Sequence, residues 1–436
     1  MENFVRQFRD KVKKKQLKIG VVGLGYVGLP LAIEFAKKGF SVTGIEVDTD
    51  RLSSLKKKIS YITDVSTVEL RCVVDSGALT ATCDFGVLKK IDVVIICVPT
   101  PLKKKYLPDI SYIKTAVRAI AGHLKKKALV ILESTTYPGT TEEVIRPLFE
   151  ARDLRHGRDF YLCFSPERID PGNTVFPVHK ITKVVGGIDK TDAYLAGLVY
   201  GTIIEKVELV SSVRVAEFAK LLENTFRLVN IGLIDEIAMM CHKMDVKVWE
   251  VIKAAKTKPF GFMPFYPGPG VGGHCIPKDP LYLYWKAKKF GFSSRFIRLA
   301  SDIISYMPAY VTSRVADLLR KKNKSLQKAK ILVVGVTYKK DIKDLRKSPA
   351  LDIIGILQEK RCAVSYYDPL IPYLKFNDID LISIKLTPSA IKRFDCVIIA
   401  TDHSRLDYAM IAGNAKLVFD TRNVYNNLSA KNIFLL

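Results

Sequence analysis

The feature that most constrains the fold is a glycine-rich turn that directly follows a short apolar segment. The segment Leu17 to Val22 has the length and composition of a buried strand. The turn that follows is Gly23-Leu24-Gly25-Tyr26-Val27-Gly28, and a helical pattern then extends to Lys38. In this motif the first glycine makes the tight turn, the second admits a pyrophosphate, and the third lets the helix pack on the strand. The turn therefore predicts a βαβ unit that binds a dinucleotide at a helix N-terminus.

Apolar runs of strand length continue along the first half of the chain and alternate with helical patterns, which is typical of a parallel α/β sheet. Further strands are expected at residues 41–47, 92–98, 128–133 and 160–164. Beyond Ser211 the pattern changes to helices, which are expected at residues 213–244, 246–255, 280–288 and 295–319, with an irregular loop over 257–280.

A second, smaller α/β region follows the basic linker Arg320 to Lys330. Its strands are expected at residues 331–336, 364–367, 396–400 and 417–419, and a helix at 348–360. We therefore expect an α/β protein in three parts. These are a dinucleotide-binding Rossmann-like domain over residues 1–210, a central helical domain over 211–320, and a second Rossmann-like domain over 321–436.

An acidic residue stands where the second strand is expected to end. Glu46 lies 18 residues past Gly28, close to the spacing at which a carboxylate binds the ribose 2′-hydroxyl of a dinucleotide. A carboxylate there favours NAD over NADP, because it repels a 2′-phosphate. Asp48 is the competing candidate for this role. A glycine-rich turn with no nucleotide is the alternative interpretation of the whole motif.

The most specific sign of chemistry is a cysteine in a second glycine-rich segment, residues 268–280. Cys275 is followed by Lys278 and Asp279, three and four residues further on. Glycines let a backbone approach a ligand closely, and a nearby ammonium favours the reactive thiolate. With a nicotinamide cofactor, such a thiol predicts an oxidation that passes through a thioester and ends at an acid. A small buried residue in a tight loop is the alternative.

Polar segments follow three of the expected strands, where the ligands of open α/β sheets bind. They are Val98-Pro99-Thr100-Pro101, Glu133 to Gly139, and Ser165-Pro166-Glu167-Arg168. The first two fall at the cofactor edge, and Glu167 could order a water molecule or hold a substrate hydroxyl. Ordinary turn chemistry and a surface glutamate are the alternatives.

The long helix carries a lysine and an asparagine four residues apart. Lys220 and Asn224 therefore share a helix face, and Glu217 and Glu223 lie nearby. A cation with a neutral donor could stabilise a developing oxyanion. By composition alone, a solvated helix face is the favoured alternative.

The charge of the chain bears on its partners. The net charge of +25 favours an anionic partner, but the lysines come in short runs along the whole chain, and no nucleic-acid motif accompanies them. A lysine-rich solvated surface is the interpretation that we favour. A nucleic-acid binder is the alternative, and it rests on charge alone.

Cysteine spacing and hydropathy exclude other classes. The eight cysteines are scattered without a Cys-x-x-Cys pair, so we expect reduced thiols, no disulfide framework and no metal site. The longest apolar runs are far shorter than the ~20 residues of a membrane helix. Residues 1–18 lack the apolar core of a signal peptide. These observations predict a soluble, cytoplasmic protein that binds neither membrane nor nucleic acid.

Together these segments resemble the nucleotide-sugar 6-dehydrogenase family, which includes the UDP-glucose and GDP-mannose dehydrogenases, from about Leu17 to Asn423. The motifs are the Cys275 loop, Gly23 to Gly28, Lys220-x-x-x-Asn224, Tyr338-Lys339 and Asp344 to Pro349. Residues 133–142, 165–173 and 258–277 resemble UDP-N-acetylglucosamine 6-dehydrogenases of bacterial surface-polysaccharide synthesis.

The resemblance implies an NAD-dependent oxidation of a UDP-sugar 6-hydroxyl to the uronic acid, with UDP-N-acetylglucosamine as the favoured substrate. UDP-N-acetylgalactosamine, UDP-N-acetylmannosamine and UDP-glucose are the alternatives. Cys275 would form a thiohemiacetal and then a thioester. Lys220 and Asn224 would stabilise oxyanions and assist proton transfer. Asp279 would position or deprotonate water. The implied catalytic residues are Cys275, Lys220, Asn224, Asp279, Thr135 and Glu167.

The resemblance also implies binding residues and partners. The expected cofactor contacts are Gly23, Gly25, Tyr26, Val27, Gly28, Glu46, Arg51, Val98, Pro99, Thr100, Pro101, Thr135, Lys278 and Arg346. The expected substrate contacts are Glu167, Arg168, Lys220, Asn224, Phe265, Tyr266, Gly273, Lys339 and Arg422. A homodimer or a higher homo-oligomer built on the long helix is implied, as is a UDP-binding C-terminal domain. A non-catalytic NAD sensor is the alternative in a different class.

The chain departs from the family pattern at two positions. Glu46 stands where many members carry Asp, and its longer arm can still reach the ribose. Lys347 replaces a Glu next to Arg346, which reverses a charge. The second departure puts the ion pairing around Arg346 in question.

Overall fold

The structure is a computed structural model that describes residues 2–62, 65–103, 107–168, 177–273, 275–426, 428 and 430–436. It divides into two compact units, Met1–Glu223 with Leu281–Phe292, and Asn224–Pro280 with Ser293–Leu436. Two parts of the predicted motifs lie outside the described residues, namely His274 in the cysteine loop and residues 169–173 of the segment 165–173. The division into residues 1–210, 211–320 and 321–436 stays a prediction.

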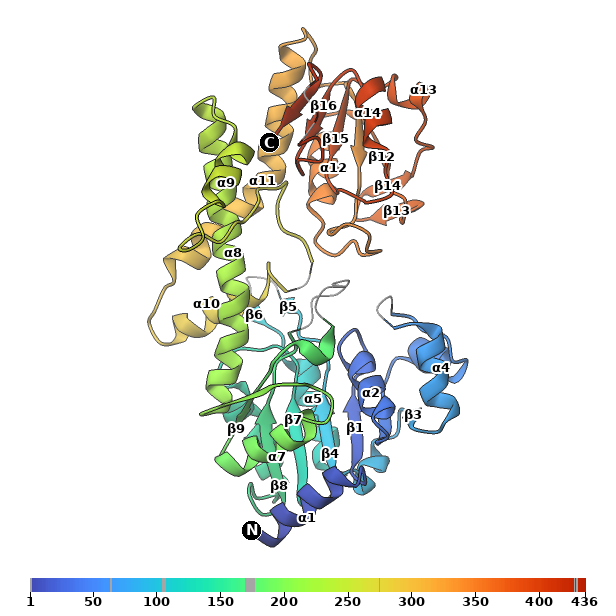
Figure 1. Ribbon diagram of the computed structural model, residues 1–436, viewed down its shortest axis with the longest axis vertical. Helices are drawn as coiled ribbons and strands as arrows, with labels where there is room; N and C mark the ends of the chain where they lie inside the picture. The colour runs from blue at the N-terminus through green and yellow to red at the C-terminus, as the bar shows by residue number, and fades with distance from the viewer. Residues whose placement is uncertain are drawn as a thin grey trace. The chain divides into compact units, whose positions relative to one another are not determined.

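The first unit is built on an eight-stranded sheet with the strand order β10-β9-β8-β7-β4-β1-β2-β3 (Figure 1). The part β3-β2-β1-β4-β7-β8 is the 3-2-1-4-5-6 order of a doubly wound dinucleotide-binding fold. The strands are β1 (Lys18–Val22), β2 (Ser41–Ile45), β3 (Leu79–Thr82), β4 (Val93–Ile96), β7 (Ala128–Leu132), β8 (Phe160–Phe164), β9 (Lys183–Gly187) and β10 (Val207–Val210), with the short pair β5 (Leu102–Lys103) and β6 (Leu107–Pro108) apart from the sheet.

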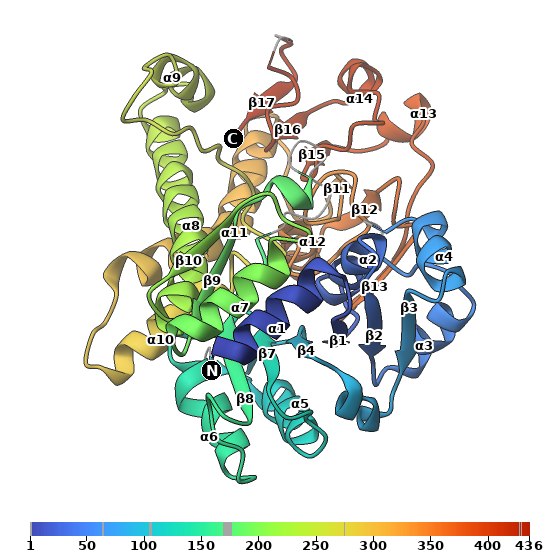
Figure 2. The same ribbon diagram turned by 60° about the horizontal axis from the view of Figure 1, so that its bottom comes forward.

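Helices cover both faces of this sheet (Figure 2). Successive residues of β4 point to opposite faces: Val93 and Ile95 pack with α1, α2 and α7, whereas Val94 and Ile96 pack with α5 and α6. Burial on both faces explains why the strands are continuous apolar runs. The helices are α1 (Glu2–Lys13), α2 (Gly28–Lys37), α3 (Thr49–Lys56), α4 (Thr67–Asp75), α5 (Ser111–Ala121), α6 (Arg146–Glu150) and α7 (Lys190–Tyr200), with short turns η1 (Phe85–Lys90), η3 (Thr141–Ile145) and η4 (Val178–Lys180).

The predicted long helix is α8 (Val213–Lys243), which begins in the first unit and ends in the second. The other predicted helices of the middle of the chain are also present. They are α9 (Val248–Ala255), α10 (Asp279–Lys289) and α11 (Arg295–Arg320).

The second unit contains a five-stranded parallel sheet with the order β12-β11-β15-β16-β17 and an antiparallel hairpin, β13-β14. Its elements are β11 (Lys330–Val334), α12 (Pro349–Glu359), β12 (Ala363–Tyr367), β13 (Tyr373–Phe376), β14 (Ile379–Ile382), α13 (Pro388–Ile391), β15 (Cys396–Ile399), α14 (Tyr408–Asn414), β16 (Val418–Asp420) and β17 (Ile433–Leu435). The expected α/β class is therefore confirmed.

One part of the sheet prediction is wrong. A parallel sheet was expected, but β9 runs antiparallel to β8, with Cys163 paired to Gly187 and Phe164 to Gly186. Helix α1, strands β3, β9 and β10, and the hairpin were not predicted, because their apolar runs are short or interrupted by charge. Within the described part of the chain, no helix is both long enough and apolar enough to cross a membrane.

Candidate active site

The glycine-rich turn after β1 is open at its middle glycine. Gly23 has a φ of +90°, and a Cβ atom there would lie 2.8 Å from the backbone oxygen of Cys97. A Cβ on Gly28 would overlap the oxygen of Gly23. A Cβ on Gly25 would meet only the Arg51 guanidinium, at 3.8 Å. Packing therefore requires the outer glycines, whereas the middle one leaves space for close approach by a ligand.

Helix α2 begins at this turn without a side-chain cap. Its N-cap residue, Val27, makes no capping hydrogen bond, and the side chain of Tyr26 beside it is exposed. The N–H groups and the dipole of a helix attract an anion at such an end. The turn therefore fits the pyrophosphate of a dinucleotide.

Glu46 is buried at the end of β2 and contacts the glycine-rich turn. Its Oε2 accepts the backbone N–H of Leu24 at 2.8 Å and lies 3.2 Å from Nη1 of Arg51. Asp48, the competing candidate, instead caps α3, where its Oδ1 accepts the N–H groups of Asp50 and Arg51. The carboxylate in contact with the turn is therefore that of Glu46.

The polar segments after β4 and β7 lie against each other. The Ser134 hydroxyl donates to the carbonyl oxygen of Val98 at 2.7 Å. The Thr100 hydroxyl donates to the carbonyl oxygen of Thr135, also at 2.7 Å. The predicted contacts Val98 to Pro101 and Thr135 therefore share one edge of the sheet.

Glu167 is not the surface residue of the alternative interpretation. Its side chain is only 14% exposed, and its Oε2 lies 3.4 Å from Nζ of Lys183. Its neighbour Arg168 pairs with Glu223 at 2.7 Å and donates to the carbonyl oxygen of Thr182 at 2.6 Å. Both side chains are therefore held at the end of β8.

Lys220 and Asn224 on α8 are buried, at 9% and 5% exposure, so the solvated-face interpretation is wrong. Nδ2 of Asn224 donates to Oδ2 of Asp279 at 2.7 Å, across 55 residues of sequence. Asp279 is itself buried, in the first turn of α10. The structure thus joins two of the predicted catalytic residues.

Cys275 is exposed, which contradicts its interpretation as a small buried loop residue. Its carbonyl oxygen accepts the N–H groups of Lys278 at 3.1 Å and Asp279 at 2.8 Å. The cysteine therefore stands one turn before α10, where a helix N-terminus favours a thiolate.

Lys278 is buried near this cysteine, with Nζ 3.8 Å from Oδ1 of Asp279. Burial lowers the pKa of the Lys278 ammonium, and the charge of Arg346 adds to this effect, whereas Asp279 and Cys275 oppose it. An ammonium that loses its proton more readily can act in proton transfer.

The predicted substrate contacts Phe265 and Tyr266 lie beside helices of the second unit. The ring of Phe265 meets that of Phe226 on α8 edge to face, with 5.8 Å between centroids. The ring of Tyr266 stacks on that of Trp249 on α9, at 6.0 Å. These contacts hold the loop before the cysteine against two helices.

Gly273 has a φ of +85°, and its N–H donates to the carbonyl oxygen of Arg346 at 2.8 Å. A Cβ there would lie 2.8 Å from the Tyr338 ring. The guanidinium of Arg346 is paired through Nε and Nη2 with Asp344. Arg346 therefore keeps an ion-pair partner, Asp344, although Lys347 reverses the charge expected next to it.

Arg422 and a buried acid on α8 meet at Gly268. The Gly268 N–H donates to Oδ1 of Asp235 at 3.0 Å, and a Cβ on Gly268 would lie 2.9 Å from Nη1 of Arg422. Arg422 also donates through Nε to the carbonyl oxygen of Ala400 at 2.8 Å. The remaining substrate contact, Lys339, is half-buried after β11.

Two buried acids on α8, Glu217 and Asp235, were missed as site residues. Burial raises the pKa of Glu217 to about 7 and that of Asp235 to about 8. The signal was present in the sequence, because both acids share a helix face with Leu221 and Leu228, which are buried. An acid on the apolar stripe of a helix predicts a buried carboxyl group.

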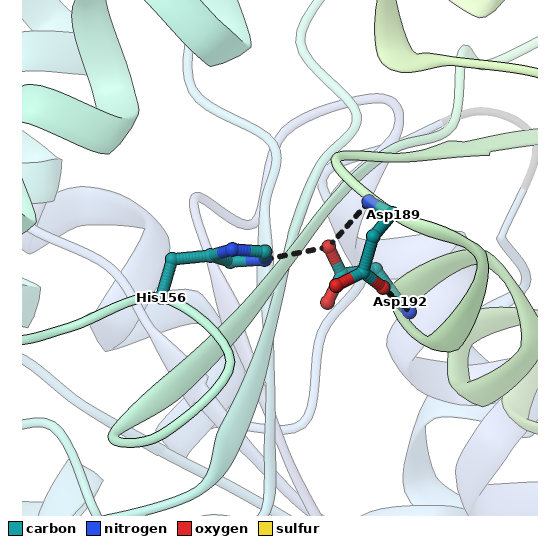
Figure 3. Close-up of side chains that lie close together, drawn as sticks. All are labelled: His156, Asp189 and Asp192. Atoms are coloured by element: carbon teal, nitrogen blue, oxygen red, sulfur yellow. Dashed lines mark hydrogen bonds and ion pairs between the residues drawn. The ribbon is translucent and has the colours of Figure 1, made fainter.

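Among the described residues, one group could hold a metal ion: His156, Asp189 and Asp192 (Figure 3). Nε2 of His156 lies 2.8 Å from Oδ2 of Asp192, and the two aspartates form a capping box at the start of α7. The group lies at the end of the sheet opposite the glycine-rich turn. The helix cap of Asp189 and Asp192 and the hydrogen bond between Asp192 and His156 account for the contacts within this group.

The doubly wound sheet and its open glycine turn define the class of protein, an α/β dinucleotide-binding enzyme. Models of the UDP-glucose/GDP-mannose dehydrogenase family match the chain over residues 17–204 (NAD binding domain), 214–304 (central domain) and 332–427 (UDP binding domain). The chain belongs to this family. It is an NAD-dependent UDP-sugar dehydrogenase.

Known relatives cover nearly the whole chain. A UDP-N-acetyl-D-glucosamine 6-dehydrogenase of Pseudomonas aeruginosa is 40% identical over 81% of this chain and 83% of its own length. A UDP-N-acetyl-D-mannosamine dehydrogenase of Pyrococcus horikoshii is 36% identical over 94% and 96%. A solved structure of UDP-D-ManNAc dehydrogenase from Pyrococcus horikoshii superposes with a TM-score of 0.87 at 34% identity, over 96% of this chain and 99% of that one.

Proposed function

We propose that this enzyme oxidises the 6-hydroxyl of UDP-N-acetylglucosamine to the carboxylate of the uronic acid, through a covalent adduct on Cys275. One observation carries the proposal. The exposed cysteine is followed three and four residues later by Lys278 and Asp279, and Asp279 is hydrogen-bonded to Asn224. A thiol, an ammonium, a carboxylate and an amide donor are the groups that a covalent aldehyde oxidation uses.

The first oxidation converts the alcohol to an aldehyde. NAD, held at the glycine-rich turn and Glu46, would supply the hydride acceptor, one molecule for each of the two oxidations. Lys220 and Asn224, one turn apart on α8, bind the substrate oxygen while its hydroxyl proton leaves. Their burial keeps water away from these donors, which strengthens their interaction with a developing negative charge.

The thiolate of Cys275 then attacks the aldehyde carbon. A C–S bond forms, and the carbonyl oxygen takes a proton to give a thiohemiacetal. Loss of the second hydride and of the hydroxyl proton leaves a thioester. Cys275 thus prevents release of the aldehyde between the two oxidations.

Hydrolysis completes the reaction. A water molecule attacks the thioester carbon, the C–S bond breaks, and the thiolate of Cys275 is restored. Asp279 positions this water and takes its proton, with Thr135 and Glu167 ordering the water. In total the alcohol and one water molecule lose two hydrides, which two NAD molecules would accept, and three protons, and the product is the carboxylate.

The remaining residues bind the two ligands. Glu46 and Arg51 hold the adenosine ribose of the cofactor, at the turn that fits its pyrophosphate. Arg346 and Lys278 are further cofactor contacts that we propose. The substrate contacts that we propose are Arg168, Phe265, Tyr266, Gly273, Lys339 and Arg422.

The number of NADH molecules formed per UDP-N-acetylglucosamine, followed by absorbance, tests the proposal. Two hydride steps through a cysteine adduct require about two NADH per sugar. One NADH per sugar would mean that an aldehyde is released, and would contradict the covalent route. UDP-glucose serves as the parallel substrate, and it should react poorly.

UDP-N-acetylmannosamine is the second candidate substrate. The relative that aligns with 94% of this chain carries that activity in its name, as does the structure with a TM-score of 0.87. The same assay with this sugar decides between the two. A higher kcat/KM for UDP-N-acetylmannosamine would make that sugar the preferred substrate, and the proposed reaction steps would stay the same.

We further infer a homodimer built on α8. One side of this helix carries six exposed apolar side chains at helical spacing, and together they form a stripe: Val215, Phe218, Leu222, Phe226, Leu233 and Met240. A large exposed apolar stripe marks a protein interface. A second copy of the same helix would bury it.

The molar mass in solution, measured by size-exclusion chromatography with light scattering, tests the dimer. Leu233→Lys should convert a dimer to a monomer, because a charge in an apolar interface is costly to desolvate. Val68→Lys, on exposed α4, is the control and should leave the mass unchanged. A wild-type monomer would contradict the inference.

A further inference from the structure

We propose that Lys183 is a positioning residue for Glu167, whose carboxylate it orients at the edge of the sheet that the glycine-rich turn also occupies. The inference rests on the proposed function, in which Glu167 orders the hydrolytic water. The family resemblance assigns no role to Lys183, and its position depends on the strand that the sequence did not predict.

The antiparallel strand β9 brings Lys183 to this edge. Glu133 directly follows β7, and Glu167 comes three residues after β8. Lys183 is the first residue of β9, and because β9 runs against β8, its first residue lies beside the ends of β7 and β8. In a parallel strand, the first residue would lie at the opposite edge.

The ammonium of Lys183 lies between two carboxylates. Its Nζ is 3.0 Å from Oε1 of Glu133 and 3.4 Å from Oε2 of Glu167. Side-chain exposure is 6% for Lys183, 0% for Glu133 and 14% for Glu167. The hydroxyl of Tyr200, at the end of α7, donates to Oε1 of Glu133, and Nζ of Lys183 lies 5.0 Å from the Tyr200 ring centre. Glu167 is thus the member of this cluster that is nearest to solvent.

The two oxygens of Glu167 are both held. Oε1 accepts the backbone N–H of Arg168 at 2.6 Å, and Oε2 faces Lys183. A small cavity lined by Glu167, Lys183 and Tyr200 adjoins them. A carboxylate fixed at both oxygens presents its lone pairs in a single direction, which is what ordering a water molecule requires.

The two carboxylates keep the Lys183 ammonium protonated. Burial lowers the pKa of the Lys183 ammonium, but the attraction of Glu133 and Glu167 outweighs burial and raises it. Burial raises the pKa of Glu133, and Glu167 adds to this effect against the attraction of Lys183. Lys183 is therefore charged at neutral pH, while burial disfavours the ionised form of Glu133. The ammonium thus stands between the fully buried Glu133, at 3.0 Å, and the more exposed Glu167, at 3.4 Å.

Lys183→Met removes the charge and keeps the length of the side chain. The carboxyl groups of Glu133 and Glu167 then lie together without the cation between them, so the acidic limb of the pH profile of turnover should move up. We expect kcat to fall roughly 10-fold to 100-fold, part of the 10²–10⁴ that general base catalysis contributes. The KM for the UDP-sugar should change little. Lys206→Met, an exposed lysine next to β10, is the matched control.

A second variant makes the test independent of folding. Glu133→Gln removes the competing carboxylate, so the ammonium serves Glu167 alone and the acidic limb of the pH profile should move down. If Lys183→Met does not fold, Glu133→Gln and the double variant Glu133→Gln/Lys183→Met carry the test. The double variant removes the ammonium together with Glu133, its most buried carboxylate partner.

Acid-quenched intact-protein mass spectrometry supplies a second readout. If Glu167 orders the hydrolytic water, the thioester on Cys275 should accumulate in Lys183→Met during turnover, as slow deacylation predicts. If Lys183→Met and Glu133→Gln lower only the Tm, leave the pH profile unchanged and accumulate no adduct, the cluster has a structural role only. That result would overturn the positioning role of Lys183 and leave the proposed function standing. A wild-type enzyme that forms no NADH with any UDP-N-acetylhexosamine would overturn the proposed function as well.

Discussion

Each of the two sheets begins with a strand that ends in a glycine turn, and the two turns can be compared atom by atom. Gly23 after β1 and Gly335 after β11 both have positive φ, +90° and +81°. Their N–H groups donate at 2.8 Å to the last residues of the neighbouring strands, to the oxygen of Ile45 and to that of Tyr367. The turn glycine therefore has the same backbone conformation and the same hydrogen bond in both units.

The acid that follows the neighbouring strand is also shared. Oε2 of Glu46 accepts the N–H of Leu24 at 2.8 Å, and Oδ2 of Asp368 accepts the N–H of Val336 at 2.7 Å. In each case a carboxylate holds the residue after the turn glycine. The two units thus use one acid in the same structural role.

The turns differ in what comes next. Helix α2 starts directly after the first turn, with Glu46 near Arg51. The second turn continues into a loop over residues 337–348 before α12, and the Asp368 carboxylate lies 3.0 Å from Nε2 of the fully buried His403. The same backbone motif is thus followed by an uncapped helix N-terminus in one unit and by a buried Asp–His pair in the other. The strand–turn pattern alone therefore does not specify a cofactor site.

The largest effect should come from removing the thiol of Cys275 in the second unit while the glycine turn in the first unit stays intact. Cys275→Ser should lower acid formation by a factor on the order of 10³ or more, because the thioester cannot form. NAD affinity, measured by fluorescence titration, should stay near the wild-type value, since the glycine turn lies in the first unit. Full turnover to the acid by Cys275→Ser would show that the covalent route is wrong.

The two turn glycines should respond alike in stability and differently in ligand binding. Gly23→Ala and Gly335→Ala each add a Cβ at positive φ against a backbone oxygen, of Cys97 and Thr401 respectively, and each should cost about 2–3 kcal/mol in urea unfolding. Only Gly23→Ala should weaken NAD. Gly77→Ala, at a φ of +73° with no atom within 4 Å, is the control and should cost about 1 kcal/mol. Equal loss of NAD binding in both turn variants would contradict this comparison.

The two turn acids should differ in the same way. Glu46→Gln should weaken NAD about tenfold, or 1.4 kcal/mol, and relax the discrimination against NADP, because the repulsion of a 2′-phosphate is lost. Asp368→Asn should leave cofactor preference unchanged and lower stability, because it breaks a buried pair with His403. Titration of NAD and NADP against each variant measures this. An unchanged preference in Glu46→Gln would move the ribose role to Asp48.

The smallest effect concerns the buried acids of α8, one in each unit. Asp235 has a pKa raised to about 8 by burial, so its contribution to stability is present below the unfolded pKa of about 4 and is lost as pH rises through 8. Asp235→Asn keeps an acceptor for the Gly268 N–H and removes this loss. The variant should gain about 1–2 kcal/mol over the wild type between pH 6 and pH 9 in urea unfolding.

Glu217 provides the contrast to Asp235. Its Oε2 accepts the Gly139 N–H and its Oε1 accepts the Thr141 N–H at 2.9 Å, so both oxygens face donors. Glu217→Gln places an NH₂ group against one of these donors and should destabilise at pH 6. If Glu217→Gln and Asp235→Asn shift stability equally, the hydrogen-bond explanation fails.

Local sequence patterns predicted much of the fold, because the periodicity of apolar residues reflects which face of a strand or helix is buried. The alternation of apolar runs and helices predicted the α/β class, and α8 matches its expected range within a residue. Strand β9 and its antiparallel direction were not predicted, because a short apolar run does not specify which neighbour it pairs with. The alternatives of a solvated face for Lys220 and of a buried Cys275 failed because exposure depends on segments far away in the chain.

By itself the sequence determined the glycine turn of Gly23 to Gly28, since a Cβ atom at Gly23 or Gly28 would collide with backbone oxygens. It likewise determined which residue is the nucleophile candidate, because Cys275 lies among glycines and next to charge. Only the tertiary structure decided that Asn224 meets Asp279, across 55 residues, and that Lys183 stands between Glu133 and Glu167. Those contacts depend on strand direction and helix packing, which arise from the burial of many side chains at once rather than from any local segment.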